Sequence, residues 1–452
     1  MKDAVDAYIR ANEDRFVEEL KDLLRFPSVS AQRDHDKDTL ACARWLRDHL
    51  AGLGLTAELA DQGGRPVIVA RGEGSGSKRV VIYGHYDVQP EDPRDQWLTD
   101  PFEPVIRDRV LYARGATDDK GQLFTHVKAV EALIRTRGAL PCEVVFLVEG
   151  EEESGGDALG RYVRGPGRDL GPDAVIISDT SMYDEATPAI TYGLRGIMTL
   201  EFTIKGPYRD VHSGEYGGAV ANPALVLARM LSQCVGPDGR VLIPHFYDDV
   251  QPPAPWEREN LRQLALDDRA LAAELKVPGL HGEAGFSTLE RLWARPTFEI
   301  NGLYGGYQGP HSKTIIPASA TAKVSVRLVP DQDPDRMRAL IYDHLRAICP
   351  ACVTLEIAPE SAGAPPALFA VDSPVMNAAT QALKEGFDTE PVFIRCGGSI
   401  PVVNTFARQW HCPVVLMGLG LDGDGAHGPN ECFGLDRFVK GIRASAAMLS
   451  RI

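Results

Sequence analysis

A histidine and an aspartate follow an apolar run at the point where that run ends in glycine. Residues 80–83 are apolar, Gly84 ends the run, and His85 and Asp87 stand two positions apart. Because strand side chains alternate between two faces, both are expected to project from the same side. A metal-bound imidazole usually donates its second ring N–H to a carboxylate, and this pair has those residue types. Taken alone, the pair is better explained as a surface histidine beside an acid.

Similar groups recur after other apolar runs of the chain. These further acids and imidazoles are Asp118 and Asp119, Glu149, Glu151, Glu152 and Glu153, Asp179, and His427. Each has a simple explanation of its own, as a helix cap, a solvated acidic loop, a turn residue or a surface residue. Parallel α/β sheets bind ligands at the carboxyl ends of their strands, however, and the simple explanations do not account for the joint placement of these residues there.

The charges of this set indicate metal ions. Asp118, Glu153 and Asp179 would repel one another strongly at one sheet edge without cations. Two divalent ions supply four positive charges, and a bridging hydroxide would leave the cluster nearly neutral. The mixture of histidine and carboxylate ligands suits zinc, and manganese or cobalt also fit by ligand type.

The elements that must position these residues alternate along the chain. The apolar runs at 67–70, 80–84, 110–113, 144–148 and 174–178 are predicted strands, and 120–137 is a predicted long helix. Continuous apolar strands separated by helices indicate an α/β domain with a mostly parallel sheet and helices on both faces. The runs at 392–394 and 414–417, with helices at 374–386 and 435–449, return to the same pattern near the end of the chain.

The middle of the chain has a different pattern. Residues 199–205, 297–303 and 320–329 alternate with a period of two, which is typical of strands with one exposed face. Helices are predicted near 223–233 and 334–348, so this part reads as an inserted α+β domain. We therefore expect a catalytic domain formed by residues 1–193 and 367–452 and split by a second domain at 194–366.

Composition excludes several classes of partner. The 452 residues have a net charge of −15, which disfavours nucleic acids and anionic membranes as partners. The first residues are charged and have no apolar core of a signal peptide, and no apolar run is long enough for a transmembrane helix. Eight scattered cysteines suit reduced thiols in a cytoplasm. Cys349 and Cys352 have CxxC spacing but no second pair, so we expect them to be structural.

Six segments in order along the chain resemble the M20 family of metallopeptidases, and most closely its cytosolic nonspecific dipeptidase and carnosinase branch. The segments are GHYDVQP at 84–90, RGATDDKG at 114–121, EGEEESG at 149–155, DVHSG at 210–214, GGSIP at 397–401 and GAH at 425–427. The resemblance covers nearly the whole chain, including the inserted domain. It implies a hydrolase of dipeptides or small peptides.

The resemblance also implies the roles of the site residues. Two zinc ions in each subunit would share Asp118. One ion would also take His85 and Asp179, and the other Glu153 and His427. Asp87 would orient His85, and Glu152 would be the general base that takes a proton from a metal-bridging water. The sequence alone does not decide which of the glutamates 151–153 has which role.

Two further roles follow from the same resemblance. His212, in the inserted ferredoxin-like domain, would reach across a homodimer interface and stabilise the oxyanion in the neighbour's active site. The inserted domain would therefore serve for dimerisation and as a lid. The residues that would hold the substrate, chiefly its terminal carboxylate, are Arg395, Gly398, Ser399, Arg327 and Thr314.

One position departs from the dipeptidase pattern. Cys396 stands where that branch commonly places a glutamate that helps to bind the free amino group of the substrate, and a thiol cannot pair with an ammonium as a carboxylate does. The alternative is therefore an N-acyl-amino-acid deacylase that uses the same metal centre. A carboxypeptidase of longer chains and a non-catalytic binding module are further alternatives, and the second is disfavoured because every ligand position is filled.

Overall fold

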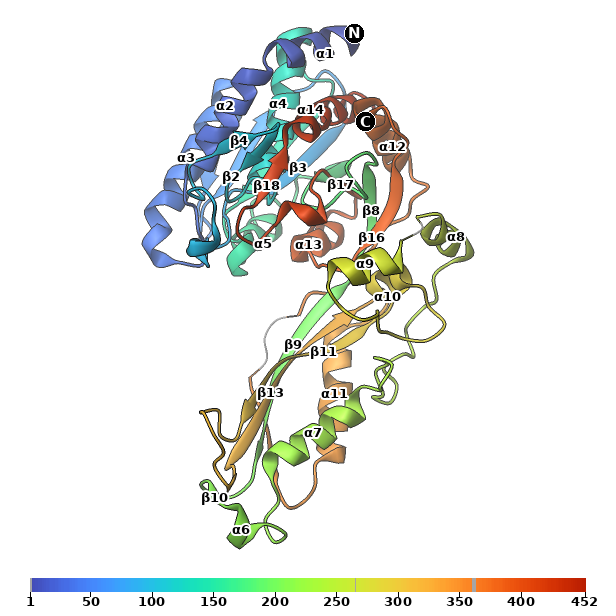
Figure 1. Cartoon of the computed structure of the whole chain (residues 1–452). Coiled ribbons are helices and arrows are strands. Elements are labelled where there is room, and N and C mark those ends of the chain that lie inside the picture. Colours follow the sequence, from blue (N-terminus) through green and yellow to red (C-terminus); the bar gives the residue numbers. More distant parts are fainter. Residues whose placement is uncertain (1, 265, 360–362) are drawn as a thin grey trace. The chain divides into compact units, whose positions relative to one another are not determined.

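The computed structural model describes residues 2–264, 266–359 and 363–452. The chain forms two compact units. The first contains the residues up to Tyr192 together with Phe369–Ile394 and Thr405–Ile452, and the second contains Gly193–Leu368 and Arg395–Asn404. The two units are drawn in Figure 1.

The first unit is built on one large sheet with a parallel centre. Its strands are β1 (Thr56–Ala60), β2 (Val67–Gly72), β3 (Arg79–His85), β6 (Glu143–Glu149), β7 (Ala174–Ile177), β8 (Ala189–Leu194), β16 (Val392–Cys396) and β17 (Val414–Gly418). The sheet order is β1-β2-β6-β3-β7-β17-β8-β15, in which β15 (Ala367–Leu368) pairs with the end of β8, and β16 also pairs with β8. The neighbours β6, β3, β7 and β17 run parallel, whereas β1, β2 and β8 are antiparallel to their partners. The expected α/β class is confirmed.

Helices bury both faces of this sheet. The helices whose residues share one apolar core are α1 (Lys2–Ala11), α2 (Glu13–Leu24), α3 (Asp36–Gly52), α4 (Lys120–Arg137), α12 (Pro374–Phe387) and α14 (Leu435–Leu449). Ile82 of β3 and Phe146 of β6 point into that core, where α4 packs beside α14 (Figure 1). Side chains alternate along β3, so Tyr83 points the other way and packs edge-on against Phe406. On that second face, α5 (Ala158–Arg164) packs against β2, and α13 (Pro401–Trp410) contributes Phe406.

The strand expected at 110–113 does not join the large sheet, so this expectation was wrong. Residues Val110–Tyr112 form β5, which pairs antiparallel with β4 (Val105–Arg107) and β18 (Cys432–Gly434) in a separate small sheet. The residues between β4 and β5 are Asp108 and Arg109, and both have positive φ, 48° and 61°. Two such residues form the tight hairpin turn that matches strand twist, and this turn pairs β5 with its nearest neighbour in sequence.

The second unit contains a four-stranded antiparallel sheet in the order β11-β13-β9-β14. These strands are β9 (Gly196–Lys205), β11 (Thr297–Gly305), β13 (Ser319–Leu328) and β14 (Thr354–Ile357). Helices α7 (Pro223–Cys234) and α11 (Pro334–Ile348) lie along one face (Figure 1). Buried residues alternate with less buried ones along β9 and β13, in agreement with the period of two in the sequence.

Smaller elements complete the second unit. They are β10 (Val211–His212), β12 (Ile315–Ile316), β15 (Ala367–Leu368), α6 (Ser213–Tyr216), α8 (Pro255–Gln263), α9 (Asp268–Glu274) and α10 (Thr288–Ala294). Across both units, no helix in the described ranges combines the length and apolar character needed to span a bilayer. The eight cysteines, including Cys349 and Cys352, are free thiols.

Candidate metal centre

Four of the five expected metal ligands follow the parallel strands of the first unit. His85 ends β3, Glu153 lies in the turn after β6, Asp179 comes two residues after β7, and His427 is on the loop beyond β17. These four strands are consecutive in the sheet, so their carboxyl ends meet at one edge. Asp118 reaches the same place from another direction, because its loop connects the small antiparallel sheet to α4. The structure thus brings the five residues together.

Asp118 lies between the two histidines. Its Oδ1 is 3.1 Å from His85 Nε2, and its Oδ2 is 3.0 Å from His427 Nε2. Asp179 Oδ2 lies 4.0 Å from His85 Nε2, and Glu153 Oε2 lies 3.4 Å from His427 Nε2. In each set of three residues the potential ligand atoms are within 4.8 Å of one another. The arrangement is therefore two three-residue groups that share the carboxylate of Asp118.

The electrostatics of the cluster fit bound cations. Burial and the neighbouring carboxylates of Asp118 and Asp119 raise the pKa of Asp179 well above its usual value. Burial and Asp118 likewise raise the pKa of Glu153 to about 7. Such shifts mean that the carboxylates destabilise one another as anions when no cation is near. Imidazole and carboxylate donors around a shared carboxylate are the donor set of a two-metal site, so these residues fit the group that the sequence indicated.

The backbone at His85 is held by Asp119. Asp119 Oδ2 accepts a hydrogen bond from the His85 backbone N–H at 3.1 Å, and burial raises the pKa of Asp119 to about 8. A Cβ on Gly84 would lie 2.7 Å from that carboxylate oxygen, so glycine is required for the approach. Asp119 occupies the N-cap position of α4 without forming a side-chain cap. The capping role considered for it from the sequence is therefore wrong.

Asp87 contacts His85 mainly through its backbone. His85 Nδ1 lies 3.0 Å from the carbonyl oxygen of Asp87 and 3.5 Å from its Oδ1. Donation from Nδ1 leaves the Nε2 lone pair facing Asp118. The other carboxylate oxygen of Asp87, Oδ2, accepts hydrogen bonds from Ser30 Oγ at 2.6 Å and from the Glu153 backbone N–H at 3.1 Å. Asp87 therefore contacts the segments of two candidate ligands.

The structure separates the three adjacent glutamates that the sequence could not distinguish. The side chain of Glu151 accepts backbone hydrogen bonds from Arg65 and Ala158, at 2.8 and 3.1 Å, and belongs to neither three-residue group. Glu153 accepts one from Gln89 Nε2 at 2.7 Å beside His427. Glu152 makes no side-chain hydrogen bond within the described ranges, and burial together with the charge of Asp118 raises its pKa.

His212 and Thr314 belong to the second unit. His212 lies on β10, which pairs with β12 so that His212 is opposite Ile315, and Thr314 immediately precedes that strand. The Thr314 carbonyl accepts a hydrogen bond from the Ser213 N–H at 3.0 Å. The exposed His212 ring accepts one from the Gly214 N–H at Nδ1, also at 3.0 Å. With Nδ1 as acceptor, the proton of the neutral ring is on Nε2.

Arg395 is already paired inside the second unit. Its guanidinium forms an ion pair with Glu257 of α8, and both side chains are buried. No local pattern indicated this partner, which lies in an insertion rich in proline and charged residues. Gly398 donates its N–H to Cys396 Sγ at 3.2 Å.

Two other arginines of the second unit are not paired with acids. Arg327 Nη1 donates to Ser399 Oγ at 3.2 Å, and Ser399 Oγ donates to the carbonyl oxygen of Arg195. Burial and the charge of Arg327 lower the pKa of Arg195 to about 10. Neither arginine forms an ion pair with a carboxylate in the described part of the chain, although both are half-buried. Arg195, which sequence reasoning missed, precedes β9 without any distinctive pattern.

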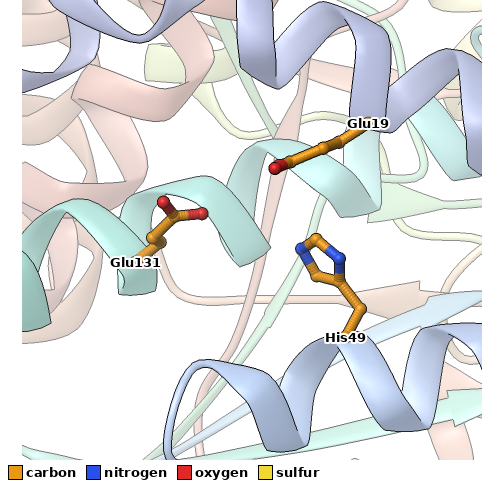
Figure 2. A group of neighbouring side chains, drawn as sticks. All are labelled: Glu19, His49 and Glu131. Carbon is orange, nitrogen blue, oxygen red and sulfur yellow. The ribbon is translucent and has the colours of Figure 1, made fainter.

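A second group of acids and a histidine lies elsewhere in the first unit. Glu19 of α2, His49 of α3 and Glu131 of α4 point toward one another in Figure 2. The fully buried ammonium of Lys128 binds all three side chains, at 2.9 Å from both His49 Nε2 and Glu131 Oε2. Arg15 of α2 also forms ion pairs with Glu19 and Glu131. Lysine and arginine thus supply the positive charge of this cluster, so the cluster joins three helices and is not a second metal centre.

Comparison with known proteins agrees with this geometry. Residues 81–451 match the model of Peptidase family M20/M25/M40. The Cys-Gly metallodipeptidase dug1 of Schizosaccharomyces pombe is 31% identical, over 96% of this chain and 95% of that protein. The Beta-Ala-His dipeptidase of Homo sapiens is 32% identical, over 97% and 90% of the two chains. The crystal structure of human carnosine dipeptidase 1 covers the whole chain and 98% of its own, with a TM-score of 0.85 and 32% identity.

Proposed function

The chain belongs to peptidase family M20/M25/M40 and is a metal-dependent hydrolase of peptide bonds, and on this basis we propose that it is a di-zinc dipeptidase. The observation that supports the proposal most directly is the position of Asp118, whose two carboxylate oxygens face two different histidines. The similar proteins named above are dipeptidases, which favours small peptides over N-acyl amino acids as substrates.

Each ion would have its own histidine. His85 and Asp179 would hold one ion, His427 and Glu153 the other, and Asp118 would bind both. Histidine with carboxylate suits zinc, and manganese or cobalt are accepted by the same ligand types. Bound divalent ions supply a Lewis acid for the peptide carbonyl and lower the pKa of water.

Glu152 is the proposed general base. It is adjacent to Glu153, and it differs from both neighbouring glutamates in having no side-chain hydrogen bond within the described residues. The raised pKa of its carboxyl group suits a residue that accepts a proton and then donates it to the leaving amine. Asp87, which contacts both His85 and the Glu153 backbone, would hold these two ligands in position relative to each other.

His212 is the proposed oxyanion donor, acting on the active site of a second subunit. Its Nδ1 accepts the Gly214 N–H, which leaves a proton on Nε2 for an outside acceptor. A second copy of the chain would pair through the inserted domain, residues 194–366, which would also act as a lid. The edge strand β11 supports this pairing, because it exposes the apolar side chains of Leu303 and Tyr304.

Substrate binding would rest on Arg327 rather than Arg395. The charge of Arg395 is neutralised by Glu257, whereas the charges of Arg327 and Arg195 have no carboxylate partner in the described part of the second unit. Two half-buried guanidinium groups that repel each other favour an anion between them, and a peptide carboxylate fits their planar donors. Ser399 Oγ, which accepts a hydrogen bond from Arg327 and donates one to the backbone carbonyl of Arg195, would fix the orientation of the Arg327 side chain.

Two further residues are proposed to contact the substrate. Gly398 leaves the loop before Ser399 without a side chain. Thr314, which lies beside His212 at the other end of β9 and β13 from Arg195 and Arg327, would contribute its hydroxyl group. The dipeptidase branch commonly has a glutamate at the position of Cys396. With a thiol there, the free amino group of a substrate has no carboxylate partner at this position. We therefore propose that the enzyme accepts small peptides without holding their amino groups by an acidic side chain.

We also propose a cytoplasmic location, in keeping with eight free cysteines.

A substrate screen tests the proposal. The protein would be stripped with a chelator, reloaded with zinc, and assayed on unblocked dipeptides, their N-acetyl and N-succinyl amino acid counterparts, and a tripeptide series. We expect metal-dependent release of amino acids chiefly from the dipeptides. Preferred cleavage of the N-acyl amino acids would instead make the protein a deacylase, and full activity without metal would refute the proposed centre.

A further inference from the structure

A buried carboxylate, Glu431, lies directly behind the shared ligand Asp118. Its Oε1 accepts hydrogen bonds from the backbone N–H groups of Thr117 and Asp118, at 2.9 and 3.0 Å. Its Oε2 accepts the Gly115 N–H at 2.8 Å and Arg114 Nη1 at 2.9 Å. The side chain is fully buried. Four donors fill the acceptor sites of both oxygens, so this carboxylate fixes the backbone from which Asp118 projects.

A second buried carboxylate holds the same loop from the side. Asp424 Oδ2 accepts a hydrogen bond from Thr117 Oγ1 at 3.0 Å. Both oxygens of Asp424 are bound by Arg437 of α14, at 2.7 and 2.6 Å. Because that guanidinium fork holds the carboxylate rigidly, Thr117 is tied to a fixed point of the fold.

The two carboxylates flank the candidate ligand His427 on one loop. Asp424 precedes His427 by three residues, and Glu431 follows it by four. His427 itself has a positive φ of 62°, a conformation that a non-glycine residue keeps only when its surroundings determine it. The loop that bears one ligand of the second ion is therefore fastened, on both sides of that ligand, to the loop that bears the shared ligand.

We propose that Glu431 is a positioning residue that sets the separation of Asp118 and His427, with Asp424 as its counterpart on the other side of His427. This inference rests on the two-metal function proposed above. Neither carboxylate touches the ligand atoms. Their effect passes through the backbone of residues 115–118 and through the loop at 424–431, so it acts most strongly on the ion that needs both Asp118 and His427 and less on the ion that shares only Asp118.

The main test is a metal titration of the Glu431→Gln variant. Glutamine keeps the shape but turns one end of the side chain into a donor, which then faces backbone N–H groups that need an acceptor. Calorimetric titration of the metal-free protein with Zn²⁺ should show two ions in the parent. In the variant, the ion held by Asp118 and His427 should bind about 10- to 100-fold more weakly, as is usual when a partner behind the ligands is lost, and the other ion should be weakened less. Excess zinc should restore much of the turnover.

A control variant and a milder variant make the result decisive. Glu283→Gln changes another buried glutamate held by arginine in the second unit and should leave both zinc affinities unchanged. Thr117→Val removes only the hydroxyl link to Asp424 and should weaken the same ion by about threefold to tenfold. If Glu431→Gln does not fold, the zinc affinities of Thr117→Val test whether these loop contacts set metal binding.

Parental zinc affinities in folded Glu431→Gln protein would overturn the inference, even if its melting temperature were lower, because the role would then be structural only. Parental affinities in Thr117→Val would overturn it if Glu431→Gln does not fold. Failure of the parent to bind two ions would be a different result, since it would refute the proposed function itself before any variant is compared.

Discussion

Glu257 and Arg395 form an ion pair in which both side chains are buried. A buried guanidinium that already faces a carboxylate is a poor anchor for a substrate anion, because binding would require the existing pair to open. Among the residues that the structure describes, the half-buried Arg327 has only the hydroxyl of Ser399 as a side-chain partner. The sequence assigned the same role to both arginines. The ion pair makes Arg395 structural and leaves Arg327 as the candidate for substrate binding.

We expect Arg327→Met and Arg395→Met to fail in different ways. Arg327→Met should raise KM at least tenfold for dipeptides with a free carboxylate, and much less for C-terminal amides. Arg395→Met removes the guanidinium partner of the buried Glu257 carboxylate. This loss should lower the free energy of unfolding by about 3–5 kcal/mol, seen as a lower melting temperature. The double variant Glu257→Met/Arg395→Met should recover most of that loss. A KM effect in the stable double variant as large as that of Arg327→Met would contradict this division.

Sequence reasoning located the metal cluster because its signal is local. An apolar run that stops at His85 or before Asp179 marks a strand end, and the parallel arrangement brings such ends to one edge. Asp118 was placed at that edge for a wrong reason. Its preceding strand pairs in the small antiparallel sheet, and its position depends on Glu431, more than three hundred residues further along the chain.

The sequence did not predict contacts between residues far apart in the chain. The pairing of Glu257 with Arg395 joins positions 138 residues apart, and nothing near either residue signals the other. The same holds for Asp424, which reads as one more acid in a loop rich in glycine and aspartate. A single sequence reports periodicity and residue type, whereas these pairings depend on how the loops pack once the sheet has formed.

Glu152→Gln should separate metal binding from proton transfer. Glutamine keeps the size of the side chain but cannot accept a proton, so turnover should fall at least about a hundredfold. Because Glu152 is not one of the proposed ligands, two zinc ions should still bind with parental affinity. Glu151→Gln is the matched control, since the Glu151 side chain is bound to the Arg65 and Ala158 backbone N–H groups and belongs to neither three-residue group. Near-normal turnover of zinc-loaded Glu152→Gln would refute the assignment of the base.

His212→Ala should lower turnover by about 10²- to 10³-fold with both ions bound, as when one oxyanion donor is removed. The action in trans is tested by mixing His212→Ala with Glu152→Gln and allowing subunits to exchange. Half of the dimers would then be mixed, with one intact site of two, so about a quarter of the parental activity should return. No recovery, with exchange shown by differently tagged subunits, would mean that His212 acts within its own subunit or not at all.

Leu303→Lys should dissociate the proposed homodimer. Leu303 is 59% exposed on the edge strand β11, and a lysine there opposes pairing with another strand or another copy. Light scattering should show a monomer, and turnover should fall together with the dimer fraction if His212 acts in trans. The control is Leu98→Lys, which places the same charge at a 76% exposed leucine of the first unit and should leave the dimer intact. A dimeric Leu303→Lys protein would remove β11 from the interface.

The metal-free protein should lose stability as the pH rises from about 6.5 to about 9, above the range in which the buried His49 and His126, whose pKa values burial lowers to about 4, contribute in the opposite direction. Burial and the charge of Asp118 raise the pKa of Glu153 from 4.5 to about 7, so the folded state binds this proton more tightly than the unfolded state. The stabilisation is present at low pH and disappears as the pH passes 7. The hydrogen bond to Asp118 raises the pKa of His427 from 6.5 to about 9, so its contribution is complete below 6.5 and is lost through 9. Glu153 and His427 therefore both lower the stability of the metal-free protein as the pH rises.

Bound zinc should reverse this trend, because the ions need deprotonated ligands and bind more tightly as the pH rises. The melting temperatures of zinc-loaded and chelator-treated protein, measured at constant ionic strength, should therefore diverge between pH 6.5 and pH 9. The metal-free Glu153→Gln variant is the control, since it has no carboxyl group at this position to titrate and its melting temperature should depend less on pH. A metal-free melting temperature that rises over this range would show that the carboxylates do not repel one another as the geometry of Asp118, Glu153 and Asp179 requires.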